Sequence, residues 1–289
     1  MPAPTSPVLE HDWLGACRRA REGLQAVLVE HPTSRERVLE TGERGEGGDR
    51  TLVIDAAAED CVFAELERLH EAGARFTAVS EERGTVDFGA GGGPPFVVVD
   101  PIDGSMNAKR GMAHHSISIA VADGPTMGDV VFGYVYDLGP REEWHAVRGE
   151  GAYLDGVRID AAPPERLTED GRLELVAVES AHPWWLRQSS DALLEHVHRI
   201  RAMGSIAISM CQVALTRVDG MATLWRSRAM DAAAAQLIVR ESGGLVAFPG
   251  FDDPLGAPVA DLTPIAPVIA ARSAASLRRL AALPATDGD

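Results

Sequence analysis

Cysteine is scarce in this 289-residue chain, which has three: Cys17, Cys61 and Cys211. They form no CxxC pair, and no histidine stands beside one of them at metal-ligand spacing. An odd number of cysteines in unrelated contexts excludes a disulfide framework and a zinc-finger arrangement. We therefore expect reduced thiols and a fold that is held together by its apolar core.

Long apolar runs are missing too. No stretch approaches the roughly 18 residues that a membrane span needs. The first residues, MPAPTSPVLEHDW, lack the basic segment and following apolar segment of a secretion signal. We expect a cytoplasmic protein with no membrane partner.

Positive charge is in short supply. The chain has 27 lysines and arginines against 43 aspartates and glutamates, a net charge of −16. No cluster of basic residues with interleaved aromatics is present, which argues against a nucleic-acid partner. A solvated surface explains the acidity, and adaptation to high salt is the alternative.

Several familiar motifs are absent as well. There is no GxxxxGK[ST] phosphate loop and no GxSxG nucleophile elbow. An EF-hand loop needs oxygen ligands at every second position, as in DxDxDG. Counted from Asp100, those positions hold Ile102 and Gly104, whose side chains carry no oxygen. These absences exclude P-loop nucleotide hydrolysis, serine hydrolysis of that type and an EF-hand calcium module.

The hydrophobic pattern predicts two halves. Residues 1–160 read as α+β, with helices from Asp12 to about Val29 and from Ile54 or Asp55 onward, followed by strands of a largely antiparallel sheet. Residues 161–289 alternate strands and helices, which indicates an α/β half. Strands are expected at 96–100, 116–122, 130–137, 143–149, 173–179, 221–225 and 267–271, and helices at 189–198, 206–218 and 231–244. The glycines and prolines of GTVDFGAGGGPP, residues 84–95, predict a loop.

The stretch Asp100-Pro101-Ile102-Asp103-Gly104-Ser105-Met106-Asn107 follows a strand that reads as buried. Pro101 restricts the backbone and Gly104 permits a tight turn, so the two carboxylates and the Ile102 carbonyl can face one side. Hard divalent cations prefer such oxygens, magnesium above all when phosphate supplies other ligands. The alternative is an ordinary turn that ends a strand.

Gly104 and Ser105 stand where the next helical turn would begin. Unpaired N–H groups and the positive helix end attract phosphate there. The Ser105 hydroxyl could orient a water molecule, and the Asn107 side chain could support the loop.

Two further acids are expected to converge on the same cleft. Glu81 follows a strand-like segment, and Asp231 starts an alanine-rich helix, so each lies at the end of an element. Taken singly, Glu81 reads as a surface residue and Asp231 as a helix cap.

In this order, the segments VSEE, VVVDPIDGSMN, GSIAISMC and MDAAAAQLIVRESGG resemble the inositol monophosphatase and fructose-1,6-bisphosphatase superfamily, the lithium-sensitive magnesium phosphatases. The resemblance runs from about Asp49 to Ala271. The pieces GYVYD and GAYLDG are most similar to the bacterial and archaeal branch. The resemblance implies an α/β sandwich of αβαβα layers and assembly as a homodimer.

The resemblance also implies the site. It places the metal ligands at Glu81, Asp100, the Ile102 carbonyl, Asp103 and Asp231. Asp55 and the Ser105 hydroxyl would activate the attacking water, with Glu81 completing the catalytic set. The implied cofactor is two or three Mg²⁺ ions, with Mn²⁺ as a substitute. A metal-bound water would attack phosphorus in line, without a phosphoenzyme.

The substrate side departs from the family pattern. Leu224 stands where animal inositol monophosphatases carry a glutamate that contacts the inositol ring. Arg201, Arg226 and Arg228 carry guanidinium groups near the expected substrate side. Guanidinium groups suit a second phosphate, and this favours a bisphosphate such as fructose-1,6-bisphosphate. Ion pairing of these arginines with the abundant acids is an equal alternative. The candidate substrate residues are Arg201, Gly204, Ser205, Arg226 and Arg228.

The sequence leaves other points open. The metabolite could be fructose-1,6-bisphosphate, inositol 1-phosphate, histidinol phosphate or a nucleotide, and a catalytically silent member that only binds metal or regulates is the non-enzyme alternative.

Residues 1–160 are expected to bind metal and phosphate, and residues 161–289 to recognise the substrate. His114 and His115 are expected to be structural or to gate the substrate. A lid at 41–50 could add a metal ligand, with Glu43, Glu46 and Asp49 as the candidates.

Overall fold

The computed structural model describes residues 6–44, 50–160 and 163–285, with side chains left out at 40–52. Glu46 and Asp49 therefore lie outside the described residues, as does the side chain of Glu43. The helices are α1 Trp13–Glu30, α2 Ser34–Arg37, α3 Val53–Glu71, α4 Ser105–Lys109, α5 Pro183–Gln188, α6 Ser190–His196, α7 Ile206–Ala214, α8 Ala229–Glu241 and α9 Ala274–Leu280. Short 3₁₀ turns occupy Pro7–Glu10 and Met127–Asp129.

An eight-stranded sheet forms the first half, in the order β10-β9-β8-β7-β6-β5-β3-β4. All its pairs are antiparallel except β3 with β5. The prediction of a largely antiparallel sheet is confirmed. Its strands are β3 Phe76–Ser80, β4 Gly84–Phe88, β5 Phe96–Asp103, β6 Ser116–Ala122, β7 Val130–Asp137, β8 Glu142–Val147, β9 Gly151–Leu154 and β10 Val157–Arg158.

A five-stranded sheet forms the second half, in the order β12-β11-β13-β15-β14. β11 pairs in parallel with both β12 and β13, whereas β15 runs antiparallel to its neighbours. A separate two-stranded sheet joins β1 Glu40–Arg44 and β2 Arg50–Leu52. The strands of the second sheet are β11 Leu173–Glu179, β12 Val197–Arg201, β13 Gly220–Thr223, β14 Leu245–Ala247 and β15 Ile269–Ala271.

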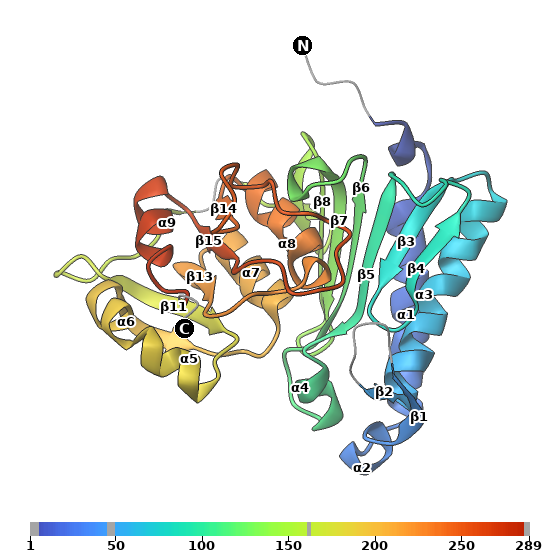
Figure 1. The fold of residues 1–289 in the computed structure, drawn as a ribbon, viewed down its shortest axis with the longest axis horizontal. Coiled ribbons are helices and arrows are strands. Elements are labelled where there is room, and N and C mark those ends of the chain that lie inside the picture. The colour runs from blue at the N-terminus through green and yellow to red at the C-terminus, as the bar shows by residue number, and fades with distance from the viewer. Residues whose placement is uncertain (1–5, 45–49, 161–162, 286–289) are drawn as a thin grey trace.

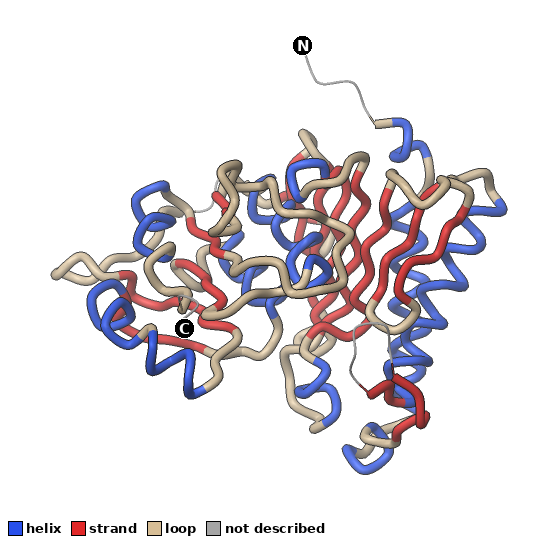
Figure 2. Tube along the Cα trace, viewed as in Figure 1, coloured by secondary structure: helices blue, strands red, loops and turns tan. Residues whose placement is uncertain are grey.

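The elements stack in alternating layers, α1 and α3, the large sheet, α7 and α8, the small sheet, and α5, α6 and α9 (Figure 1). The tube in Figure 2 shows the strands gathered into two separate sheets with helices between them. Side chains alternate between the two faces of each strand, so Val176 and Val178 face the outer helices while Ala177 faces α7 and α8. The predicted αβαβα sandwich is confirmed.

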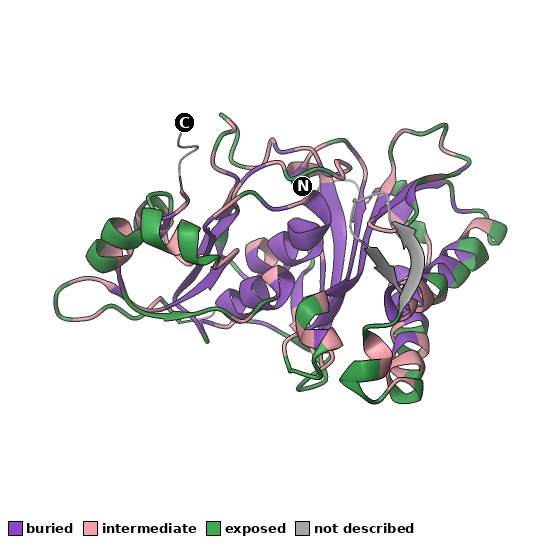
Figure 3. Ribbon diagram, turned by 60° about the horizontal axis from the view of Figure 1, so that its bottom comes forward, coloured by how far each residue is buried: buried purple, intermediate pink, exposed green. Residues whose placement is uncertain are grey.

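Helix α8 occupies the middle layer and is almost wholly buried, as Figure 3 shows. Its alanines, Ala232–Ala235, let it approach the large sheet closely. At Gly133 on β7, an added Cβ would lie 2.5 Å from the Ala234 carbonyl oxygen. This close packing brings the first turn of α8, which carries Asp231, toward the end of β5.

Two sequence-based assignments were wrong. Residues 84–88 were expected to be loop but form β4, an edge strand whose Thr85, Val86 and Asp87 pair with β3. The helix expected at 189–198 ends at His196, and Val197 begins β12. Both strands lie at sheet edges. In β4 the alternation Thr85, Val86, Asp87 and Phe88 is short and stands beside a glycine- and proline-rich stretch, whereas all but the first residue of β12 are exposed, so that β12 carries no apolar alternation. Among the described residues, no helix is long and apolar enough to cross a membrane.

Candidate active site

The end of β5 carries two buried carboxylates, Asp100 and Asp103, which are 3% and 6% exposed. Asp100 lies opposite Ser118 of β6 and Asp103 opposite Ser116, so β5 advances three residues while β6 advances two. A bulge of this kind turns a strand and re-aims its side chains. Asp100 Oδ1 accepts the N–H of Ile102 at 3.0 Å, which holds the turn in shape.

The turn continues through Gly104, which has φ 85° and begins α4. The Asn107 side chain donates to the carbonyls of His114 at 2.8 Å and Met203 at 2.7 Å. Asn107 therefore fastens the DPIDGS loop both to its own half and to the second half, which confirms its expected supporting role.

Asp103 is bonded directly to the second half. Its Oδ2 accepts the Ser205 hydroxyl and, at 2.9 Å, the N–H of Ala207. Ser205 also caps α7 by accepting from Ile208. At 1% exposure, Ser205 is committed to Asp103 and the helix rather than to the cavity surface, whereas the adjacent Gly204 does line the cavity.

Glu81 and Asp231 reach the same place from other elements. Glu81 directly follows β3, the parallel neighbour of β5. Asp231 lies in the first turn of α8 and accepts the backbone N–H of Arg228 at 2.9 Å. The Arg228 guanidinium bonds Glu81 Oε1 at 2.5 Å, and its Nε lies 3.6 Å from Asp231 Oδ1.

These groups surround one cavity of about 700 Å³. The structure brings the following predicted residues to its wall: Glu81, Asp100, Ile102, Asp103, Gly104, Ser105, Gly204, Arg228 and Asp231. Asp55 does not line this cavity; it lies in the first turn of α3, and its carboxylate is 3.9 Å from the ammonium of Lys109, the last residue of α4, the helix that begins at the cavity.

Two predicted arginines lie elsewhere. Arg201 is exposed on β12 and donates to the carbonyl of Ile200, and it is not on the cavity wall. Arg226 lines a separate cavity of about 490 Å³, with its guanidinium 5.7 Å from the Trp225 ring centroid. Trp225 borders both cavities and therefore stands between Arg226 and the acids.

The carboxylates disfavour one another's charge. Burial, and next Asp231, raise the pKa of Asp103 to about 7. Burial, followed by Asp103 and Glu81, raises the pKa of Asp100 well above its usual range. Burial raises the pKa of Asp231 even though Arg228 opposes the shift. Desolvated acids on the wall of one cavity are stabilised by a cation that neutralises them.

Comparison with known proteins agrees with this arrangement. The model of the inositol monophosphatase family matches residues 11–274. The chain belongs to the inositol monophosphatase family. Membership confirms the resemblance and the expected class, a phosphoric monoester hydrolase.

Relatives within the family carry several names. A fructose-1,6-bisphosphatase/inositol-1-monophosphatase of Thermococcus kodakarensis is 36% identical over 200 residues, 69% of this chain and 70% of that protein. One of the same name from Methanothermobacter thermautotrophicus is 31% identical, over 81% and 83%. The Nus factor SuhB of Haemophilus influenzae is 31% identical, over 80% and 82%.

Solved structures share the fold. An inositol monophosphatase-fructose 1,6 bisphosphatase superposes with a TM-score of 0.75 at 23% identity, covering 94% of this chain and all of that one. A Pyrococcus horikoshii protein with similarities for inositol-1 monophosphatase gives 0.74 at 23% identity, covering 94% and 98%.

The cavity wall also contains residues that the sequence patterns did not single out. Glu179 is 3% exposed and accepts from Met203, Gly204 and Ser209 at 2.9, 2.9 and 2.6 Å. It thus positions the loop before α7 that faces the DPIDGS turn. The sequence offered one indication of this role, which is that Glu179 ends the strand predicted at 173–179.

An aromatic pair forms another part of the wall. The rings of Trp185 and Trp225 stack with centroids 4.0 Å apart and planes 2° from parallel. Leu224, which replaces the inositol-contacting glutamate, is fully buried against the small sheet. The stacked rings therefore give the cavity wall a flat aromatic part, and Leu224 contributes no carboxylate to that wall.

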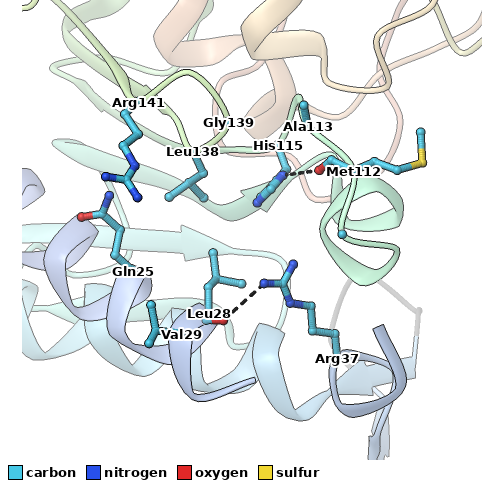
Figure 4. A pocket seen from close by; sticks show the side chains of 11 residues that line it. Gln25, Leu28, Val29, Arg37, Met112, Ala113, His115, Leu138, Gly139 and Arg141 are labelled. Carbon is cyan, nitrogen blue, oxygen red and sulfur yellow. Dashed lines mark hydrogen bonds between the residues drawn. The ribbon is translucent and has the colours of Figure 1, made fainter. Parts of the chain in front are cut away.

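A third cavity, of about 560 Å³, lies beside the 111–115 loop (Figure 4). Arg37, His115 and Arg141 supply its basic groups. His115 is 7% exposed and donates from Nδ1 to the Met112 carbonyl at 3.1 Å. Burial, and next Arg37, lower its pKa, which supports a structural role for the neutral ring.

Arg37 ties three carbonyls together. It donates to Leu28 at 3.2 Å, the bond drawn in Figure 4, and also to His31 at 2.8 Å and to Ala108 at 2.9 Å, and so joins the ends of α1 and α4. We expect Arg37→Met to destabilise the protein by about 2 kcal/mol, because the carbonyls lose their donors. Urea unfolding measures this, with Arg35→Met on the exposed side of α2 as the control. Equal midpoints for the two variants would contradict the assignment.

Proposed function

We propose that this chain is a magnesium-dependent phosphomonoesterase that hydrolyses a small sugar, polyol or related phosphate with a metal-activated water. The observation that carries the proposal is that Glu81, Asp100, Asp103 and Asp231 all line one cavity. Burial raises the pKa of Asp100, Asp103 and Asp231, and these carboxylates, with Glu81 and the Ile102 carbonyl, form an all-oxygen donor set that suits Mg²⁺, with Mn²⁺ as a substitute. The residues present therefore fit the cofactor that the family is expected to use.

When bound, two or three such ions lower the pKa of water and neutralise charge on the phosphate oxygens. The protein groups have separate tasks in this proposal. Asp55 and the Ser105 hydroxyl orient the attacking water, with Lys109 holding the Asp55 carboxylate. The N–H groups of Gly104 and Ser105 bind the phosphate. Glu81 serves in both the metal and the catalytic sets.

Substrate binding involves both halves. Gly204 presents its backbone to the cavity, and Arg228 supplies a guanidinium there. Arg226, beyond Trp225, is placed for a longer substrate with a second phosphate, such as fructose-1,6-bisphosphate. Arg201 is exposed on β12 and does not line the cavity, so it takes no part in substrate binding. Two residues of the second half depart from the division into a metal half at 1–160 and a substrate half at 161–289. Asp231 is a proposed metal ligand, and Ser205 is bonded to Asp103.

The stacked tryptophans favour a second candidate. A flat aromatic wall suits a leaving group with an unsaturated ring, such as histidinol or a nucleoside. Histidinol phosphate and nucleotides therefore stand beside fructose-1,6-bisphosphate and inositol 1-phosphate as substrates. Homodimer assembly and a cytoplasmic location remain predictions from the resemblance and the sequence.

A panel assay tests the function. Phosphate release is measured from fructose-1,6-bisphosphate, inositol 1-phosphate, histidinol phosphate and adenosine monophosphate with Mg²⁺, with Mn²⁺ and with EDTA. We expect release that EDTA abolishes and that one compound dominates. No release from any compound with either metal would favour a catalytically silent, metal-binding member.

A further inference from the structure

Arg228 is unusual among the groups of the active site because it is a cation placed within the acids. It precedes α8 in extended backbone, and its side chain is 23% exposed. The guanidinium bonds Glu81 and lies near Asp231, two of the proposed metal ligands. Burial alone would lower the pKa of Arg228, but Asp231, Glu81 and Asp100 raise it above its usual value.

The carboxylates are arranged around this guanidinium. Within the described part of the chain, no three acid, histidine or cysteine side chains converge closely enough to hold a metal ion between them. Glu81 turns its Oε1 toward Arg228, and Asp231 is engaged by both the backbone and the side chain of the same residue. A divalent cation that coordinates Glu81 Oε1 or Asp231 Oδ1 therefore has to displace the guanidinium from that atom.

We propose that Arg228 is an internal counter-ion that competes with the divalent cation for Glu81 and Asp231, and that its charge passes to the substrate once those carboxylates coordinate metal. This inference rests on the proposed function, since it assumes that Glu81 and Asp231 are metal ligands. Arg228 already lines the cavity, so a guanidinium released from the acids remains beside the bound anion. Its planar fork of donors matches phosphate oxygens.

The proposal predicts a link between metal loading and anion binding. While Arg228 neutralises the acids, the cavity has little net attraction for phosphate. Once the cation takes over that role, the guanidinium adds to the positive charge that faces the substrate. Arg228 would thus lower metal affinity and raise the affinity of the loaded enzyme for its anionic substrate.

The test uses Arg228→Met, which keeps much of the side-chain length and removes the charge. Mn²⁺ binding is measured by isothermal titration calorimetry on metal-free protein. We expect the tightest Kd to fall by on the order of tenfold in Arg228→Met, about 1.4 kcal/mol. The difference in Tm between EDTA and Mn²⁺ should widen accordingly, because ligand binding stabilises by linkage. Arg199→Met, which removes an exposed charge on β12 away from the cavity wall, should leave the Mn²⁺ Kd unchanged.

Inorganic phosphate supplies the second readout. In the presence of saturating Mn²⁺, Arg228→Met should bind phosphate several-fold more weakly than the wild type. Arg228→Lys keeps the charge without the fork, and we expect its Mn²⁺ affinity to stay near that of the wild type. This variant also serves if Arg228→Met does not fold, since a tenfold gain in Arg228→Lys would contradict competition by charge.

The outcomes separate the two proposals. Wild-type protein that binds no Mn²⁺ at the acids would overturn the proposed function itself. Wild-type protein that binds Mn²⁺ while Arg228→Met binds it equally well or more weakly would overturn the role of Arg228 alone. A fixed, purely structural Arg228–Glu81 pair predicts this last result, because its loss would disorder a ligand.

Discussion

Replacing Asp100 with asparagine should lower metal-dependent turnover by on the order of 10³-fold while the protein stays folded. The loss of one ligand charge removes several kcal/mol of stabilisation from the transition state, and about 1.4 kcal/mol corresponds to a factor of ten in rate. Folding should survive because the amide oxygen can still accept the Ile102 N–H. The measurement is kcat/KM for the best substrate of the panel, together with Tm in EDTA.

The chain offers a matched control in Asp137. Asp137 is 1% exposed, ends strand β7 and accepts the N–H of Gly139 at 3.0 Å, but it does not line the active-site cavity. Asp137→Asn should keep turnover within about twofold of the wild type because it lies outside the reacting groups. Equal losses in the two variants would show that Asp100 acts through the fold rather than through a metal.

Replacing Gly104 with alanine should damage both stability and activity. Gly104 has φ 85°, and an added Cβ would lie 2.8 Å from the His114 carbonyl oxygen and 2.9 Å from that of Gly204. The left-handed backbone costs about 1–2 kcal/mol for alanine, and the clash adds about 1–3 kcal/mol. Because both oxygens belong to backbone, relief of the clash must move the DPIDGS turn, and turnover should fall by on the order of 10²-fold.

Gly149 provides the control for backbone conformation alone. Its φ is 81°, and nothing lies within 4 Å of an added Cβ. Gly149→Ala should therefore show only the conformational penalty and normal turnover. Urea midpoints and kcat/KM measured on both variants decide the matter. Similar destabilisation and similar activity in the two variants would remove the steric argument for Gly104.

The first half of the site could be predicted from the sequence because its signals are local. A buried strand, a proline, a glycine and two aspartates stand within a few residues, and β5 and its turn follow from them. Asp12 as the cap of α1 is predictable for the same reason, since its carboxylate accepts the N–H of Gly15 three residues on.

The contacts between the halves could not be predicted in this way. The bond from Ser205 to Asp103 joins residues 102 positions apart, and the sequence offered Ser205 only as a substrate residue. The separation of Arg226 from Arg228 by Trp225 depends on how the backbone turns before α8. The pairing of Arg228 with Glu81 likewise requires β3 and α8 to meet in three dimensions.

Edge strands were the weakest part of the fold prediction. β4 and β12 are each five residues long. The alternation in β4 covers only four residues beside a glycine-rich stretch, and β12 exposes all but its first residue, so that hydrogen bonds to the neighbouring strand define both. The strands β5, β6 and β7, which are buried on both faces, were recognisable from the sequence.

Anomalous diffraction from crystals soaked in Mn²⁺ tests directly whether the acids of the cavity bind metal. We expect anomalous peaks within coordination distance of Asp100, Asp103 and Asp231, with the Arg228 guanidinium withdrawn from Glu81. Crystals with peaks only at surface carboxylates, or with none while the enzyme releases phosphate in the same Mn²⁺ concentration, would contradict the assignment of these acids as the metal site.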